Sequence, residues 1–304
     1  MNQSVSQMLG QQTLLTCLPD KKDKIMIELK HADCLEYLRT LDDESAELVV
    51  VDPPYFEIVK DAWDNQWDSE QEYLDWCKSW TQECFRVMKP GACFYVWGTT
   101  KTDTFLRYKL NVLNEIPDAH YQNWIIWAYD WGGRTKKKFP RKHEDILMYS
   151  KGKEFPFYAD QVRVPRKVKS NMNIKRKINL LKKKIAGEPF AGADHHSWDK
   201  YNFNRLNPED YASTLSDLQA KDTKMAEGKI PTDVWIKNNH TTSKEYAGWH
   251  TTQKPISLLE RIIKAHTQPG DTVLDCFSGS GSAMIAAHNT GRNFKGCEFE
   301  LEYI

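Results

Sequence analysis

An apolar run that ends in two prolines constrains the fold of this chain more than any other segment. Residues 46–51 form an apolar stretch of the kind found in strands buried in a parallel sheet. This stretch runs directly into Asp52, Pro53, Pro54 and Tyr55. Because proline fixes the backbone φ angle, the tetrapeptide predicts a stiff turn at the carboxyl end of a buried strand.

Strand-like and helix-like segments alternate on both sides of this turn. Helical spacing of apolar residues predicts helices over 35–41, 71–88, 258–263 and 283–288. The expected strands cover 25–29, 46–51, 92–97, 124–129, 145–150, 272–275 and 293–298. This alternation predicts an α/β fold.

The alternation stops between residues 155 and 245. The centre of this stretch, 163–184, is dense in Lys and Arg and contains no acidic residue. We therefore expect four parts. They are a loosely ordered arm (1–23), a first half of the main domain (24–154), an insert (155–245) and a second half of the main domain (246–304). The chain ends shortly after the last strand, which leaves little room for a further helix.

Composition narrows the class of protein. Lys plus Arg and Asp plus Glu both number 42, so affinity for nucleic acid must come from uneven placement of charge. No signal peptide and no membrane-spanning run is evident, which predicts a cytoplasmic protein without a membrane partner. The 7 cysteines show no CxxC spacing and predict reduced, mostly buried thiols, with no metal site expected.

The turn at Asp52 suits the activation of an exocyclic amine on a nucleic-acid base. Such an amine is a poor nucleophile, because its lone pair is delocalised into the ring. If the Asp52 carboxylate and the Pro53 carbonyl accept its two N–H bonds, the nitrogen moves toward tetrahedral geometry and the lone pair is freed. Tyr55 would offer a ring on which a flipped base stacks.

A second turn, Phe277 to Gly281, joins a predicted strand to a predicted helix and is rich in glycine. Such turns let a ligand approach the backbone closely, although many carry glycine for steric reasons alone. Glu298, at the end of the last strand, either accepts bonds from ribose hydroxyls or is a solvated strand end. The pattern is neither GxGxxG nor GxxxxGK[ST], which disfavours dinucleotide-dependent redox enzymes and ATPases.

These motifs resemble the N6-adenine/N4-cytosine family of DNA amino-methyltransferases, in its circularly permuted β group. The order is the same: Asp52 to Tyr55 matches the DPPY motif, the insert follows, and Asp275 to Gly281 matches the cofactor loop. Residues 249–255 resemble the family's HPTQKP signature, with Thr251 in place of proline. The resemblance implies a doubly wound, mainly parallel seven-stranded sheet of the S-adenosylmethionine-dependent methyltransferase type, with an inserted target-recognition domain.

The resemblance also implies site residues. The catalytic set is Asp52, Pro53, Pro54 and Tyr55. The set expected to bind S-adenosylmethionine is Asp33, Cys34, Asp52, His250, Thr252, Lys254, Asp275, Phe277, Ser278, Gly279, Ser280, Gly281 and Glu298. Within this set Asp33 and Cys34 would lie near the adenine of the cofactor, Glu298 would hold the ribose, and Lys254 would pair with the cofactor's carboxylate.

Basic residues in two places are candidate contacts with duplex DNA. The same residues could instead form a solvated helix face and an exposed loop. They are Arg134, Lys136, Lys137 and Lys138 after residues 132–133, and Arg163, Arg166, Lys167, Lys169, Lys175, Arg176 and Lys177 in the insert.

The residues leave several alternatives open. The same geometry could activate the N4 amine of cytosine, and the family's preference for DPPY at adenine favours N6. A DNA-binding regulator without catalysis, or an RNA or protein substrate, would keep the same fold. Methylation at carbon 5 is disfavoured, because that reaction needs a thiolate and the sequence has no Pro-Cys pair. The resemblance implies a bacterial or phage-encoded enzyme, and leaves open whether it is a homodimer and whether a restriction endonuclease accompanies it.

Overall fold

The computed structural model describes residues 25–58, 64–130, 135–137, 139–165, 169–237 and 253–303. The chain divides into two compact units, one made of Met1–Tyr158 with Thr232–Ile304 and the other of Ala159–Pro231. The second unit begins later and ends earlier in the sequence than the predicted insert, 155–245. Before it, the Tyr158 N–H donates to Ala265 O in the first unit. After it, the chain returns to the sheet as a short strand.

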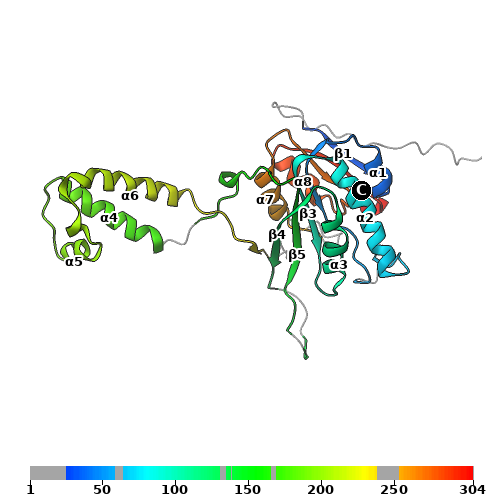
Figure 1. Ribbon diagram of the computed structural model, residues 1–304, viewed down its shortest axis with the longest axis horizontal. Helices are drawn as coiled ribbons and strands as arrows, with labels where there is room; N and C mark the ends of the chain where they lie inside the picture. Colours follow the sequence, from blue (N-terminus) through cyan, green and yellow to red (C-terminus); the bar gives the residue numbers. More distant parts are fainter. Residues whose placement is uncertain are drawn as a thin grey trace, which may run out of the picture. The chain divides into compact units, whose positions relative to one another are not determined.

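An eight-stranded sheet forms the centre of the first unit (Figure 1). Its order is β1 (Ile27–His31), β8 (Asn293–Glu298), β7 (Thr272–Asp275), β2 (Ala46–Val51), β3 (Met88–Gly98), β5 (His143–Lys151), β4 (Ala119–Ala128) and β6 (Val234–Ile236). All neighbouring pairs are parallel except those of β5, which runs antiparallel to β3 and β4. The mainly parallel sheet expected from the sequence is therefore confirmed.

Helices cover both faces of this sheet, as a doubly wound fold requires (Figure 1). Val49 and Val51 of β2 pack in the core beneath α1 (Cys34–Arg39), α2 (Glu70–Val87) and α3 (Thr104–Asn111). Leu48 and Val50 point the other way, toward α7 (Ile256–His266) and α8 (Ser282–Asn289). Burying each such side chain stabilises the fold by about 1.5–3 kcal/mol. Both faces of β2 are thus in apolar cores, which explains its uninterrupted apolar sequence.

The expected count of seven strands is corrected to eight among the described residues. The additional strand is β6, which pairs parallel with β4 between Ile126 and Val234. It has only 3 residues, of which Trp235 alone is buried, so it carries no periodic signal. A second difference lies at Pro90, which falls between the predicted helix 71–88 and the predicted strand 92–97. It lies inside β3, beside a register shift between β2 and β3 of the kind that accommodates proline.

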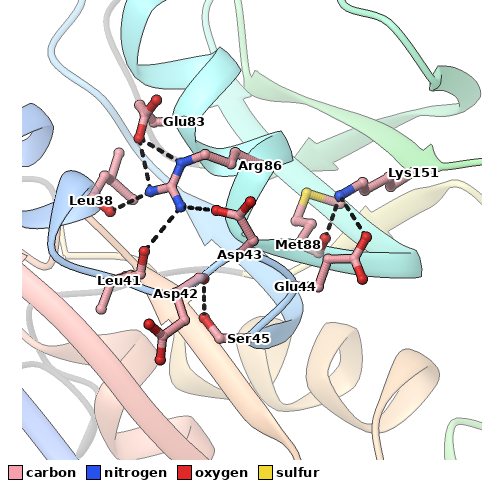
Figure 2. Close-up of polar contacts among 10 residues, drawn as sticks. All are labelled: Leu38, Leu41, Asp42, Asp43, Glu44, Ser45, Glu83, Arg86, Met88 and Lys151. Carbon is pink, nitrogen blue, oxygen red and sulfur yellow. Dashed lines mark hydrogen bonds and ion pairs between the residues drawn. The ribbon is translucent and has the colours of Figure 1, made fainter.

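Arg86, near the end of α2, fixes the loop that leads from α1 into β2 (Figure 2). Its guanidinium donates to the carbonyl of Leu38, in the last turn of α1, and to that of Leu41, just after the helix, 2.8 and 3.0 Å away. Ion pairs with Asp43 and Glu83 complete its contacts. These contacts of Arg86 hold the loop before β2 in place, and so help to position β2 and the turn that follows it.

The unit Ala159–Pro231 is helical and has a core of its own. It contains α4 (Lys169–Ile185), α5 (Ala193–Lys200) and α6 (Tyr211–Ala226). Leu180, Leu181, Trp198 and Phe203 are buried together, with Leu215 of α6 packed against them. The basic run of the sequence therefore contributes apolar residues on one side of α4 to a small core.

The six described cysteines are unbonded and buried, as the sequence predicts; Cys17 lies outside the described residues. Burial raises the pKa of thiols such as Cys34 and Cys297, which makes them poor nucleophiles. In the described ranges no group of His, Cys, Asp and Glu side chains is arranged to hold a metal ion. None of the helices in the described part of the chain has both the length and the apolar composition of a bilayer crossing.

Candidate active site

A cavity of about 350 Å³ opens at the edge of the sheet where β7, β2 and β8 end. Parallel strands place their carboxyl ends at one edge, and ligands of doubly wound proteins bind there. Most of the expected site residues line this cavity: Asp33, Cys34, Asp52, Pro53, Pro54, Tyr55, Lys254, Asp275, Phe277, Ser278, Gly279, Ser280 and Glu298. Gly281 does not line it, and His250 and Thr252 lie outside the described residues.

Both carboxylate oxygens of Asp52 accept hydrogen bonds from neighbouring side chains. The Tyr55 hydroxyl donates to Oδ1 over 2.7 Å, and the Lys254 ammonium donates to Oδ2. Burial, followed by the charges of Asp52 and Glu144, raises the pKa of Tyr55, so this hydroxyl keeps its proton. The Pro54 carbonyl accepts a bond of 3.0 Å from the Tyr73 hydroxyl, which anchors the turn to α2. The turn therefore holds an oriented carboxylate at the cavity wall.

Lys254 is buried between two carboxylates, which the sequence did not indicate. Its Nζ bonds to Asp52 and lies 3.4 Å from Oε2 of Glu144. Burial alone would lower the pKa of Lys254, but the charges of Asp52 and Glu144 outweigh burial and raise it. The resemblance implied that Lys254 pairs with a cofactor carboxylate; in this structure its partners are the protein's own carboxylates.

Glu144 is a cavity residue that the sequence reasoning missed. It lies at the start of β5, opposite Trp127 of β4. Burial raises the pKa of Glu144, and Lys254 partly opposes that effect. The available signal was two adjacent charged residues, Glu144 and Asp145, that lead into the apolar residues 146–149 of β5, since such residues are rarely buried without a partner.

The glycine-rich turn between β7 and α8 adopts backbone angles that favour glycine. The φ angles of Gly279 and Gly281 are 45° and 71°, in the left-handed region. Gly281 is the N-cap of α8. Phe277 packs edge-on against Trp76 and Trp80 of α2, with ring centroids 5.7 and 5.1 Å apart, and so holds the turn in place.

Asp275 carries a buried carboxyl at the end of β7. Its pKa is raised to about 8: burial is the largest cause, the charges of Asp52 and Glu298 act in the same direction, and a hydrogen bond of 3.0 Å from the Phe277 N–H opposes the shift. Near neutral pH this group is therefore largely protonated while the cavity is empty. A cation placed beside it would favour its ionisation.

Asp33 and Glu298 each have structural bonds in addition to their places in the cavity. Asp33 caps α1, since its Oδ1 accepts from the N–H groups of Leu35 and Glu36. The Glu298 carboxylate accepts bonds of 2.6 Å from Gly279 N and 2.9 Å from Glu300 N. It joins the end of β8 to the glycine-rich turn, so the idea of a merely solvated strand end is wrong.

Aromatic residues that the sequence reasoning did not assign line the cavity beside Glu144. They are Trp97, Trp127 and Tyr129, with Arg141 beside them. Trp97 and Trp127 are the last residues but one of β3 and β4. This position near a strand end could have indicated them as cavity residues. Trp67, before α2, is buried against Tyr73 and anchors its segment to the core.

The candidate DNA contacts fall partly within the described residues. Lys175 and Arg176 are exposed on α4, whereas Lys177 lies over the ring of Tyr201, 4.8 Å from its centroid. Arg163 pairs with Asp160. Lys136 and Lys137 are exposed, and Lys169 begins α4. Arg134, Lys138, Arg166 and Lys167 lie outside the described residues.

Solved structures with the same fold are methyltransferases. The chain matches the PvuII DNA methyltransferase (cytosine-N4-specific) with a TM-score of 0.61 and 17% identity, covering 91% of this chain and 83% of that one. The M1.HpyAVI-SAM complex matches with a TM-score of 0.52 and 21% identity, over 91% and 95% of the two chains. The sheet of this chain therefore has the α/β fold of these two proteins.

Sequence comparisons give the family. The Type II methyltransferase M1.MboII of Moraxella bovis is 29% identical over 283 residues, 91% of this chain and 93% of that protein. The DNA adenine methyltransferase YhdJ of Escherichia coli (strain K12) is 28% identical over 296 residues, 95% and 83% of the two chains. Residues 46–304 match the N6/N4 family model described as DNA methylase. The chain belongs to this family of N6-adenine and N4-cytosine DNA methyltransferases.

Proposed function

We propose that this DNA methyltransferase transfers the methyl group of S-adenosylmethionine to the N6 amine of a flipped adenine in duplex DNA. One observation carries the proposal: the Asp52 turn and the Gly279 turn, far apart in sequence, line one cavity. A site for amine activation and a site for a cofactor are thereby adjacent, as direct transfer between two bound groups requires.

The charge of the cavity fits this cofactor. Among the described residues that line it, the acidic ones are Asp33, Asp52, Glu144, Asp275, Glu298 and Glu300, and the basic ones are Arg141 and Lys254. S-adenosylmethionine supplies the methyl group on a positively charged sulfonium, which an excess of carboxylates favours. The Glu298 carboxylate accepts one N–H bond at each oxygen and keeps lone pairs for ribose hydroxyls.

The protein's part in the reaction is to orient and polarise the amine. Asp52 is held by Tyr55 and Lys254, and each of its oxygens keeps a second lone pair for an N–H of the substrate. The Pro53 carbonyl is the second acceptor in the proposal, and the ring of Tyr55 stacks on the base. In the cavity these groups are shielded from bulk water, which strengthens their electrostatic effect.

The choice of adenine is supported by Asp52 as the first residue of the motif, and by the relative YhdJ, described as a DNA adenine methyltransferase. Mass analysis of nucleosides from treated duplex DNA tests it. We expect N6-methyladenine; N4-methylcytosine without N6-methyladenine would show that the base is cytosine.

We further propose that α4 contacts DNA phosphates through its exposed cations, with the unit Ala159–Pro231 acting as the target-recognition domain. Lys175 and Lys182 are exposed and have no ion-pair partner among the described residues, whereas Lys183 pairs with Asp194. Replacing both Lys175 and Lys182 with Gln should weaken DNA binding and reduce the slope of log K against log salt by about 2. Lys183→Gln is the matched control, with a smaller expected effect on the slope. Fluorescence anisotropy across a salt series measures the slope.

Cofactor binding should depend on pH through Asp275. Its pKa of about 8 means that a cation binds to a neutral carboxyl below that pH and to a carboxylate above it. The affinity for S-adenosylmethionine should therefore rise with pH, by up to about 10-fold per pH unit, and level off above the pKa. Asp275→Asn should flatten this dependence. Isothermal titration calorimetry below and above that pKa measures it, and an unchanged slope in the variant would assign the dependence to another group.

A further inference from the structure

Glu144 is a buried carboxylate that the proposed transfer does not use. It lies at the amino end of β5 and reaches the same cavity as Asp52. Lys254 connects the two, because its Nζ bonds to Oδ2 of Asp52 and lies 3.4 Å from Oε2 of Glu144. A hydrogen bond from Lys254 to Asp52 and an ion pair from Lys254 to Glu144, whose Oε2 has no hydrogen-bond partner among the described residues, link the amine-activating carboxylate to a second buried carboxylate; we call these three groups the path.

The net charge of Asp52, Lys254 and Glu144 determines whether these groups can accept a proton. Asp52 and Lys254 alone would form a neutral ion pair, and a neutralised carboxylate is a weak proton acceptor. With Glu144 ionised, two carboxylates share one ammonium and the group carries a net charge of one negative unit. The path can therefore take up one proton and become neutral, which is favourable in a buried site.

Methylation of an amine releases such a proton. As the bond from nitrogen to the methyl carbon forms, the bond from sulfur to that carbon breaks and the sulfonium becomes a neutral thioether. The nitrogen becomes positively charged and must lose a proton to give the neutral methylamine.

We propose that Glu144 receives this proton through Lys254, an inference that rests on the proposed amine methylation. The amine proton passes to the Asp52 carboxylate. Lys254 then gives one of its protons to Glu144 and takes the proton from Asp52, so Lys254 stays an ammonium and Asp52 is again a carboxylate. Glu144 ends as a neutral carboxylic acid, and it later releases its proton to solvent. One proton is lost by the amine and one is gained by Glu144.

The surroundings of Glu144 suit a proton acceptor. The ionisable side chains that face it from the described elements are Asp52 and Tyr55 after β2, Tyr129 after β4, Arg141 before β5 and Lys254 before α7. Burial and Asp52 favour its neutral form, whereas Lys254 and Arg141 favour the ionised form in which it accepts. Both forms are therefore accessible, and the pKa of Glu144 lies above its ordinary value.

The test is the pH dependence of a single turnover. Enzyme in excess, labelled S-adenosylmethionine and long duplex DNA of mixed sequence, prepared without base methylation, give the rate of the methyl-transfer step. In the wild type this rate should fall as pH drops through the raised pKa of Glu144, because a protonated Glu144 cannot accept. Glu144→Gln should lower the neutral-pH rate on the order of 10²-fold and abolish this acid limb. Because Glu144 is one of several carboxylates that line the cavity, the rate is measured at saturating cofactor and DNA, so that a change in binding does not enter it.

Two further variants separate proton transfer from a structural role. Glu144→Asp should fold with the same charge, keep the acid limb and give an intermediate rate, because its shorter side chain lies farther from Lys254. Asp145→Asn removes a buried carboxylate one residue along β5, whose oxygens bond to Trp124 and Thr100, and should keep the acid limb.

An acid limb that persists in Glu144→Gln would overturn the inference, whether or not the rate falls. If that variant does not fold, a Glu144→Asp rate equal to wild type would overturn it. A wild-type protein that transfers no methyl group to any base amine would instead refute the proposed function.

Discussion

Asp52→Ala should reduce methyl transfer by about 10³-fold or more while leaving the protein folded. The variant removes the acceptor that draws the amine toward tetrahedral geometry. It does not leave the buried ammonium without a partner, because Lys254 still lies 3.4 Å from Glu144. The loss should therefore appear in the rate of the transfer step and only weakly in stability. Transfer of labelled methyl groups under single-turnover conditions, with urea unfolding on the same preparations, measures both.

The control for this variant is Asp42→Ala. Asp42 is exposed in the loop before β2, and its backbone carbonyl, not its carboxylate, accepts the bond from Ser45. It should transfer methyl groups at the wild-type rate. Retention of wild-type activity by Asp52→Ala would remove the basis of the proposed mechanism. Among the described residues of the site, Asp52 is the carboxylate that directly precedes the two prolines of the turn.

Among the proposed variants, Lys254→Met should lower the free energy of unfolding the most, by about 3–5 kcal/mol at neutral pH. It should also lose methyl transfer. The methionine fills much of the same volume, so the cost comes from charge. Asp52 and Glu144 then face each other across a buried site with no cation bonded to Asp52. Breaking a buried ion pair by removing one partner is costly for this reason.

The sign of the pH dependence identifies the cause. Burial and the charge of Asp52 raise the folded-state pKa of Glu144 above its ordinary value, and the loss of Lys254 removes a group that opposes this shift. Groups whose pKa is raised on folding destabilise the folded state as pH rises through that range. The difference in stability between Lys254→Met and wild type should therefore shrink at mildly acidic pH. Urea unfolding at neutral and acidic pH checks this, and a deficit that does not change with pH would point to packing instead.

An exposed lysine provides the matched control. Lys264 on α7 pairs with Glu260 over 3.5 Å, and its side chain is 38% exposed. Lys264→Met should cost about 0–1 kcal/mol, as surface ion pairs generally do. The contrast between the two lysines isolates the effect of burial.

The sequence predicts most of the sheet because its strands carry strong apolar patterns. The strands at 46–51, 272–275 and 293–298 lie where expected. The three helices of the insert were not assigned, and β6 was missed. In α4 frequent lysines obscure the apolar side, and β6 is too short to show alternation.

Some residues of the candidate site could be predicted from local sequence and others could not. Asp52 to Tyr55 and Phe277 to Gly279 were found because turns with proline or glycine leave local signals. The pairing of Lys254 with Asp52 and Glu144 depends on which strands are neighbours, since these residues come from distant parts of the chain. Local sequence does not encode that contact. Because buried charges require partners, Glu144 could have been predicted to have one. The sequence does not show that this partner is Lys254.

The strand order has a consequence for synthesis on the ribosome. β7 and β8 lie between β1 and β2, although they are made last. Until they emerge, β1 and β2 cannot belong to one sheet, and the nascent chain exposes two apolar edges that could pair with other chains. The main domain therefore forms its cavity only after β7 and β8 have been synthesised. A fragment ending before Thr272 should be aggregation-prone, and a separate peptide spanning β7 to β8 should restore its solubility.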